Sequence, residues 1–146
     1  MSRKNPMGSD VVEGFACKPE TIDPDRPILF AAAHIFICDG ERCRSCYPFD
    51  VTGKLRELIK KMDHHKGDDR IKVTRTGCNG ACRYRAFAYA YQNGNARSYT
   101  IATCFSAWKN VHGWTTDQWK ELISSLLEGR TPESLREFAV EDKVYY

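Results

Sequence analysis

The chain of 146 residues has the length of a single domain with one hydrophobic core. Its composition, with 42% hydrophobic and 28% charged residues, is that of a globular protein and excludes disorder throughout. A net charge of +3 is too small to indicate nucleic-acid binding. The longest apolar run, residues 28–37, is about half as long as a membrane span. We therefore expect neither a nucleic-acid nor a membrane partner.

Seven cysteines are many for a protein of this kind. No secretory signal opens the chain, so we predict a cytoplasmic protein. A reducing compartment does not keep structural disulfides, and an odd number of cysteines would leave one thiol unpaired. The thiols are therefore expected to bind metal or to do redox chemistry.

Residues 1–27 contain several glycines and prolines and no hydrophobic periodicity. We predict an N-terminal extension there, in which Cys17 is a spare thiol. The apolar run at 28–37 is typical of a strand that is buried on both faces. His34 within it is expected to be a hydrogen-bonded residue of the sheet rather than a ligand. Three cysteines follow this strand: Cys38, Cys43 and Cys46.

A helix is predicted to begin near residue 50 and to end at about Met62. Asp50 or Thr52 can cap its start, and apolar residues recur at the helical spacing i, i+3, i+4, i+7. Residues 63–70 form a polar connection, and residues 71–74 form a second short strand. That strand leads directly into Cys78 and Cys82, which have the spacing C-x₃-C.

Residues 86–91 and 96–101 flank Asn93-Gly94 and predict a β-hairpin, because both turn residues readily take positive φ. Residues 103–113 look less regular. Thr115 or Thr116 can cap a last helix that ends at Gly129, with a short helical turn at 131–135. The order β-α-β-β-β-α predicts an α/β domain at residues 28–135, in which helices cover a central sheet, and a C-terminal tail at 136–146.

Two loops that each follow a strand and each carry thiols indicate a metal site built from two parts of one fold. Thiolates are soft ligands, and sets of four hold zinc or iron–sulfur clusters. The small residues between Cys78 and Cys82 let the backbone curl and turn its N–H groups toward sulfur. A C-x₃-C pair alone is weak evidence, but the first group of cysteines strengthens it.

The thiol motifs resemble those of the bacterial thioredoxin-like 2Fe–2S ferredoxins, a family related to the thioredoxin-like cluster subunit of respiratory complex I. The matching motifs are His34-Ile35-Phe36-Ile37-Cys38, Ser45-Cys46 and Thr76-Gly77-Cys78 with Cys82. The resemblance runs from about Ala33 to Leu135. It implies a thioredoxin-like fold, a 2Fe–2S cluster held by four cysteines, and a one-electron carrier rather than an enzyme. Compared with the family, this chain adds residues 102–112 between the hairpin and the last helix.

The resemblance implies that Cys38, Cys78 and Cys82 are ligands and leaves two options for the fourth. Cys43 gives the C-x₄-C spacing of the complex I relatives, whereas Cys46 matches the Ser-Cys of the bacterial ferredoxins. We favour Cys46, because counting from it places the apolar residues of the next helix as in the family without a gap. The predicted ligand set is therefore Cys38, Cys46, Cys78 and Cys82, with Cys43 as the alternative to Cys46.

Three other interpretations of the thiols stay open. The spacing of Cys38, Cys43, Cys46 and the distant Cys78 imitates plant-type ferredoxins, but it leaves Cys82 unused. Cys43 and Cys46 have the spacing of a dithiol redox pair, although the next helix begins too late for one. Zinc suits four thiolates equally well, and the protein would then be an adaptor module of a larger redox or biosynthetic complex.

Positive side chains flank the predicted ligands in both loops: Arg42, Arg44, Arg75, Arg83 and Arg85. They predict a positive rim at which an acidic redox partner protein docks. The sequence is also compatible with a homodimer.

Overall fold

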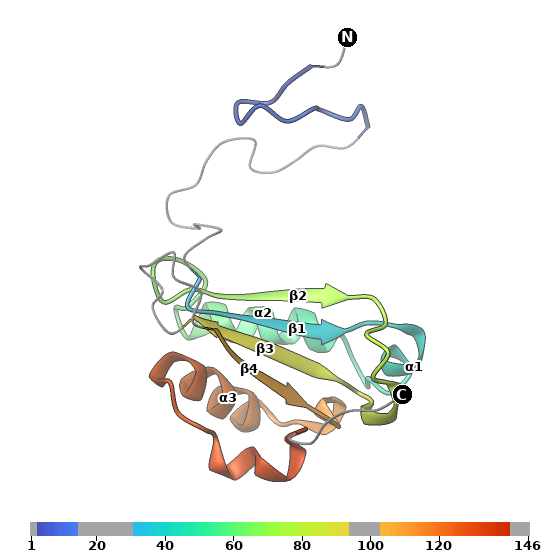
Figure 1. The fold of residues 1–146 in the computed structure, drawn as a ribbon, viewed down its shortest axis with the longest axis vertical. Coiled ribbons are helices and arrows are strands. Elements are labelled where there is room, and N and C mark those ends of the chain that lie inside the picture. The colour runs from blue at the N-terminus through green and yellow to red at the C-terminus, as the bar shows by residue number, and fades with distance from the viewer. Residues whose placement is uncertain (1–2, 15–30, 94–102, 141–146) are drawn as a thin grey trace.

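The computed structural model describes residues 3–14, 31–93 and 103–140 (Figure 1). The elements, with η for a 3₁₀ helix, are β1 (Ala33–Cys38), α1 (Glu41–Arg44), α2 (Val51–Lys61), β2 (Ile71–Thr76), η1 (Cys82–Tyr84), β3 (Ala88–Asn93), β4 (Thr103–Trp108), η2 (Val111–Gly113), α3 (Thr116–Glu128) and η3 (Glu133–Phe138). Within these described ranges, no helix has the length and apolar character needed to cross a membrane.

The four strands form one mixed sheet in the spatial order β2-β1-β3-β4. β1 and β2 run parallel, whereas β3 is antiparallel to both β1 and β4. A parallel pair needs a crossover connection, which α1 and α2 provide. The carboxyl ends of β1 and β2 therefore meet at one end of the sheet, beside α1, with Cys38 opposite Thr76 (Figure 1).

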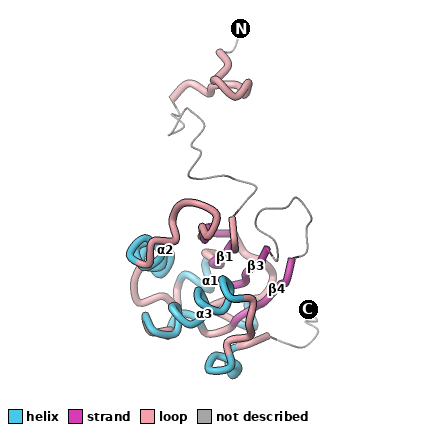
Figure 2. The backbone as a smooth tube through the Cα atoms, turned by 90° about the vertical axis from the view of Figure 1, so that its left-hand side faces the viewer, coloured by secondary structure: helices cyan, strands magenta, loops and turns pink. Residues whose placement is uncertain are grey.

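The two long helices lie on the same side of the sheet (Figure 2). Asp50 caps α2 by accepting the Gly53 N–H at 3.1 Å. Thr115 and Gln118 form a reciprocal capping box at the start of α3. Gly129 ends α3 in the left-handed conformation, with a φ of 69°. Both helices thus begin and end where the sequence predicts.

The core lies between the sheet and these two helices. Every second residue of each strand faces the helices, and each helix contributes one apolar stripe. The buried side chains include Ile35, Ile37, Leu55, Ile59, Ile71, Val73, Ala88, Ala90, Trp108, Trp119, Leu122, Ile123 and Leu126. This packing fixes the sheet on which both thiol loops stand.

The prediction that the first strand is buried on both faces is wrong. Alternate residues of β1 are buried against the helices, but His34 and Phe36 on the other face are only partly buried. Phe36 stacks on Tyr89 of β3 with ring centroids 4.8 Å apart. Tyr91 and Phe105 extend this aromatic face and are 41% and 56% exposed. The sequence of β1 is continuously apolar because the face turned away from the helices packs against aromatic rings and carries few polar groups.

His34 is a hydrogen-bonded residue of the sheet, as predicted. Its Nε2 lies 2.7 Å from Oγ1 of Thr74, and its ring stacks on Phe36 with centroids 3.9 Å apart. Burial, together with the positive charges of Lys72 and Arg70, lowers the pKa of His34 to about 4. The imidazole is therefore neutral at physiological pH.

The hairpin places its second strand later in the chain than the sequence predicts. Residues 103–113, expected to be less regular, contain β4 and η2, whereas the expected strand at 96–101 lies outside the described residues. In the β3–β4 register, Tyr91 faces Phe105. Residues 94–102 thus connect the two strands, so the added segment is not an irregular insert after the hairpin. The sequence does not show the alternation of apolar and polar residues that is typical of a strand at β4, because both faces of this strand carry apolar residues.

Ala139 and Val140, which the sequence assigns to the C-terminal tail, pair with β4. Ala139 forms a β-bridge with Trp108, and the Val140 N–H donates to the carbonyl of Ala107 at 2.9 Å. The packed part of the chain therefore continues to Val140. Of the predicted extension at 1–27, the structure describes residues 3–14, and its Cys17 lies outside the described residues.

Candidate metal centre

The first thiol loop follows β1 directly. Cys38 is the last residue of that strand, and its N–H donates to the carbonyl of Phe87 at 3.0 Å. The chain then turns through Asp39 and Gly40 into α1, a four-residue helix too short to show in the sequence pattern. The α1 helix carries Cys43. Both thiols of this loop are buried, with Cys38 3% and Cys43 1% exposed.

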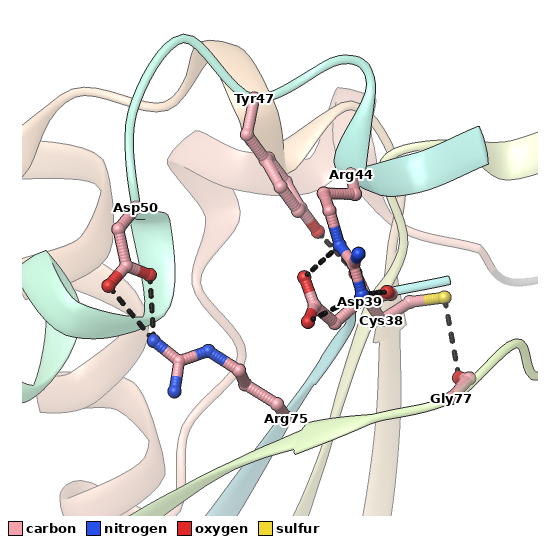
Figure 3. Close-up of polar contacts among 7 residues, drawn as sticks. All are labelled: Cys38, Asp39, Arg44, Tyr47, Asp50, Arg75 and Gly77. Carbon is pink, nitrogen blue, oxygen red and sulfur yellow. Dashed lines mark hydrogen bonds and ion pairs between the residues drawn. The ribbon is translucent and has the colours of Figure 1, made fainter. Parts of the chain in front are cut away.

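Two side chains hold this loop in shape (Figure 3). Tyr47 Oη donates to the carbonyl of Cys38 at 2.7 Å. Arg44 donates from Nη2 to the carbonyl of Asp39 at 2.8 Å and pairs with the carboxylate of the same residue at 3.2 Å. The turn between β1 and α1 is thus tied down by groups from α1 and from the segment after it.

The second thiol loop follows β2 at Thr76. Asn79 Nδ2 donates to the Thr76 hydroxyl at 2.8 Å, which closes the start of the loop. Gly80 has a φ of 74°, a conformation that favours glycine, and its N–H donates to Cys78 Sγ at 3.4 Å. This tight turn brings the Sγ atoms of Cys78 and Cys82 to 3.5 Å from each other. The small residues therefore act as the sequence predicts.

The parallel pairing of β1 and β2 brings the two loops together. The Asp39 N–H donates to the carbonyl of Thr76 at 2.8 Å, and Cys38 Sγ donates to the carbonyl of Gly77 at 3.6 Å (Figure 3). Burial raises the pKa of Cys43, and the nearby Cys38 thiol adds to this rise. A cavity of about 200 Å³ is lined by Cys38, Gly40, Glu41, Arg42, Cys43, Cys78 and Cys82. Two thiol pairs from two loops thus surround one cavity.

Cys46 does not line that cavity. Its Sγ donates to the carbonyl of Arg42 at 3.6 Å, and its side chain is partly buried against the core. The structure therefore brings Cys43, the alternative, to the cavity and leaves out Cys46, which we favoured. The physical reason is α1, since its single turn directs Cys43 inward and ends before Cys46.

The thiols of the two loops differ in acidity. The N–H of Gly80 and the neighbouring Cys82 thiol lower the pKa of Cys78, which is exposed. Burial raises the pKa of Cys43 to about 11. Cys78 thus readily gives a thiolate, whereas Cys43 keeps its proton unless a cation takes its place.

Arg44 and Arg75, which flank the predicted ligands, form ion pairs with carboxylates. Arg44 pairs with Asp39, as described above. Arg75, at the end of β2, donates from Nη2 to both carboxylate oxygens of Asp50 at 2.9 Å (Figure 3). This second pair ties β2 to the start of α2, and it offsets much of the positive charge of Arg75.

The other arginines lie close to the exposed thiol pair. Arg42 lines the cavity, and its positive charge contributes to the lowered pKa of Cys78. Arg85 donates from Nε to the carbonyl of Cys82 at 2.9 Å and so helps to shape the loop. Arg83 lies in η1, next to Cys82, and is exposed. Positive charge is therefore concentrated beside the second loop.

The donor set fits a group that four thiolates hold in pairs. Among the residues that the structure describes, no three His, Cys, Asp or Glu side chains gather closely enough to hold one metal ion. The thiols instead form the pairs Cys38–Cys43 and Cys78–Cys82 around the cavity. A binuclear iron–sulfur cluster takes two thiolates at each iron. The Gly80 N–H directed at Cys78 sulfur is the kind of contact that stabilises such a group.

Sequence reasoning did not single out Gly40 or Tyr47. Both act across a turn or between loops, so no periodic spacing marks them. The glycine directly before a thiol-bearing helix was the available signal for a close approach of backbones.

A second cavity of about 640 Å³ lies between β4, α3 and η3, and none of the four thiols lines it.

No family model and no curated protein sequence matches this chain. Among solved structures, the chain is similar to the thioredoxin-like [2Fe-2S] ferredoxin of Aquifex aeolicus, with a TM-score of 0.50 and 15% sequence identity. The match covers 75% of this chain and 97% of that chain. At this identity the likeness shows the fold alone. The chain has an α/β, thioredoxin-like fold, which confirms the predicted fold class.

Proposed function

We propose that this protein is a one-electron carrier that holds a 2Fe–2S cluster through Cys38, Cys43, Cys78 and Cys82. The observation that carries the proposal is the convergence of two thiol pairs, from two strand-end loops, on one cavity. The fold shared with a 2Fe–2S ferredoxin supports it. When bound, such a cluster takes up and releases a single electron.

The two thiol pairs would then have different tasks. Cys38 and Cys43 are both buried, and hydrogen bonds to the Phe87 carbonyl and from Tyr47 hold the backbone of Cys38, so this pair anchors the inner side. Cys78 is exposed, and the N–H of Gly80 and the charge of Arg42 favour negative charge on its sulfur. A partner protein would therefore approach over the second loop. Because no bond of a substrate is made or broken, the protein is an electron-transfer protein and not an enzyme.

An acidic redox protein is the proposed partner. The proposed positive rim consists of Arg42, Arg44, Arg83 and Arg85. Arg42 lines the cavity, whereas Asp39 offsets part of the charge of Arg44. Such a rim speeds encounter more than it tightens the final complex. A cytoplasmic location, a homodimer, and the lack of nucleic-acid and membrane partners stay predictions from the sequence.

Reversible reduction tests this proposal. The protein, purified without oxygen, should lose much of its visible absorbance on addition of dithionite, show a rhombic paramagnetic signal in the reduced state, and recover its absorbance on reoxidation. The reason is that the proposed site stores one electron without other chemistry. A chain that stays unchanged by dithionite, at full metal content, would contradict the carrier role.

The second candidate is an adaptor module whose zinc or cluster has a structural role. The observation that favours it is the open aromatic face of the sheet, where Tyr91 and Phe105 remain exposed. The same measurement separates the carrier from an adaptor that holds zinc, because zinc is silent in redox and paramagnetic experiments.

A further inference from the structure

The two thiol loops touch each other at Gly40. A Cβ atom added to Gly40 would lie 3.1 Å from Cα and from Cβ of Cys78, and 3.2 Å from its backbone nitrogen. Carbon atoms in contact normally stay ~3.5–4.0 Å apart. Two of these three close neighbours are backbone atoms, which cannot rotate away. Any side chain at position 40 therefore has to push the second loop outward.

The backbone of Gly40 does not itself require glycine. Its φ of −64° and ψ of 158° are extended values that any residue adopts. The position is also the N-cap of α1, where serine, threonine, aspartate or asparagine would stabilise a helix better, and no side chain caps α1 here. The close approach of Cys78 is thus the physical reason for glycine.

Neither loop can yield easily at this contact. On the first loop, Asp39 is held by Arg44 and by its N–H bond to the Thr76 carbonyl (Figure 3 shows the Arg44 contacts). On the second loop, Cys78 Sγ accepts the N–H of Gly80. Relief of a clash at residue 40 would break at least one of these bonds or displace the thiol.

We propose that Gly40 is a positioning residue: by lacking a side chain, it sets the distance between the Cys38–Cys43 pair and the Cys78–Cys82 pair. Its role toward a cluster rests on the proposed function, but the contact between the loops does not. Lengthening this distance leaves each pair intact and pulls apart the four-thiol site that they share.

The test compares Gly40→Ala with Gly77→Ala in the metal-loaded protein. Gly77 lies in the second loop beside Cys78, a Cβ there meets no atom within 4 Å, and its φ is not positive, so it is a matched control. A chelator should remove metal about 10- to 100-fold faster from Gly40→Ala, and about as fast from Gly77→Ala as from the wild type. The g values of the reduced protein should shift only in Gly40→Ala.

A third variant separates spacing from helix capping. Gly40→Ser carries the same Cβ but adds a hydroxyl that can cap α1. If spacing matters, Gly40→Ser loses metal as fast as Gly40→Ala; wild-type release from Gly40→Ser would overturn the proposal in favour of capping. Equal release from Gly40→Ala and Gly77→Ala would also overturn it.

The far-ultraviolet circular dichroism of Gly40→Ala should match that of the wild type, because the contact is confined to the two loops. Loss of the fold in Gly40→Ala would overturn the proposal, since the contact would then support the fold rather than the spacing. If the wild-type protein carries zinc, the electron-carrier function fails, while the release rates of zinc from the same variants still test Gly40.

Discussion

Replacing Cys43 by serine is expected to abolish or grossly reduce the visible absorbance of the protein, whereas Cys46→Ser should keep it. Cys43 is 1% exposed and lines the cavity together with Cys38. Cys46 does not line the cavity and bonds instead to the carbonyl of Arg42. A hard serine hydroxyl is a poor replacement for a soft thiolate at iron. Absorbance per chain, measured on protein purified without oxygen, decides between the two thiols.

The same measurement on other single variants provides the controls. Cys78→Ser and Cys82→Ser should lose the absorbance, since these thiols form the second pair. The remaining cysteines, Cys17 and Cys104, are not among the proposed ligands, and their serine variants should keep the absorbance. Retention in Cys43→Ser with loss in Cys46→Ser would restore our first ligand set. Partial loss in both would mean that the two thiols exchange at the site.

Charge reversal at Arg42 should slow electron transfer to the physiological partner by about tenfold at low salt, within the range known for electrostatic steering. Arg42 lines the cavity and acts on Cys78, and its side chain shapes neither loop through a hydrogen bond that the structure describes. The variant Arg42→Glu therefore changes charge with little change of geometry. Arg85 is less suitable, because its Nε bond to the Cys82 carbonyl would be lost as well.

Salt and a distant charge change provide the controls for this effect. The Debye length falls from ~10 Å at 0.1 M to ~3 Å at 1 M salt, so the wild-type rate should approach that of Arg42→Glu as salt rises. Lys120→Glu makes the same charge change at an exposed position of α3 and should alter the rate much less. A transfer rate that depends on neither salt nor Arg42 would point to apolar docking, with the aromatic face around Tyr91 as the next surface to vary.

The two long helices, α2 and α3, and their ends could be predicted because local chemistry determines them. Asp50 and Thr115 accept backbone N–H groups whatever the rest of the chain does, and Gly129 relieves the strain of a left-handed residue. The strand β4 could not be predicted in the same way. Phe105 lies on the aromatic face and Trp108 on the core face, so both faces are apolar and the period of two disappears.

The part of the site that follows from the order of the strands, namely the meeting of the two cysteine loops, could be predicted. Two parallel strands that each end in a cysteine loop place Cys38 opposite Thr76, two residues before Cys78, and the sequence shows both loops. The orientation within the first loop was not predictable. It depends on α1, whose single turn is too short for any periodicity and directs Cys43 inward. Counting residues to the next helix therefore favoured Cys46.

Metal and sulfide analysis tests the central claim most directly. Protein taken from its native host and purified without oxygen should be red-brown and contain about two iron and two acid-labile sulfide per chain, because the two thiol pairs together hold one binuclear cluster. The same sample should contain little zinc. Stoichiometric zinc without sulfide in that sample would contradict the account.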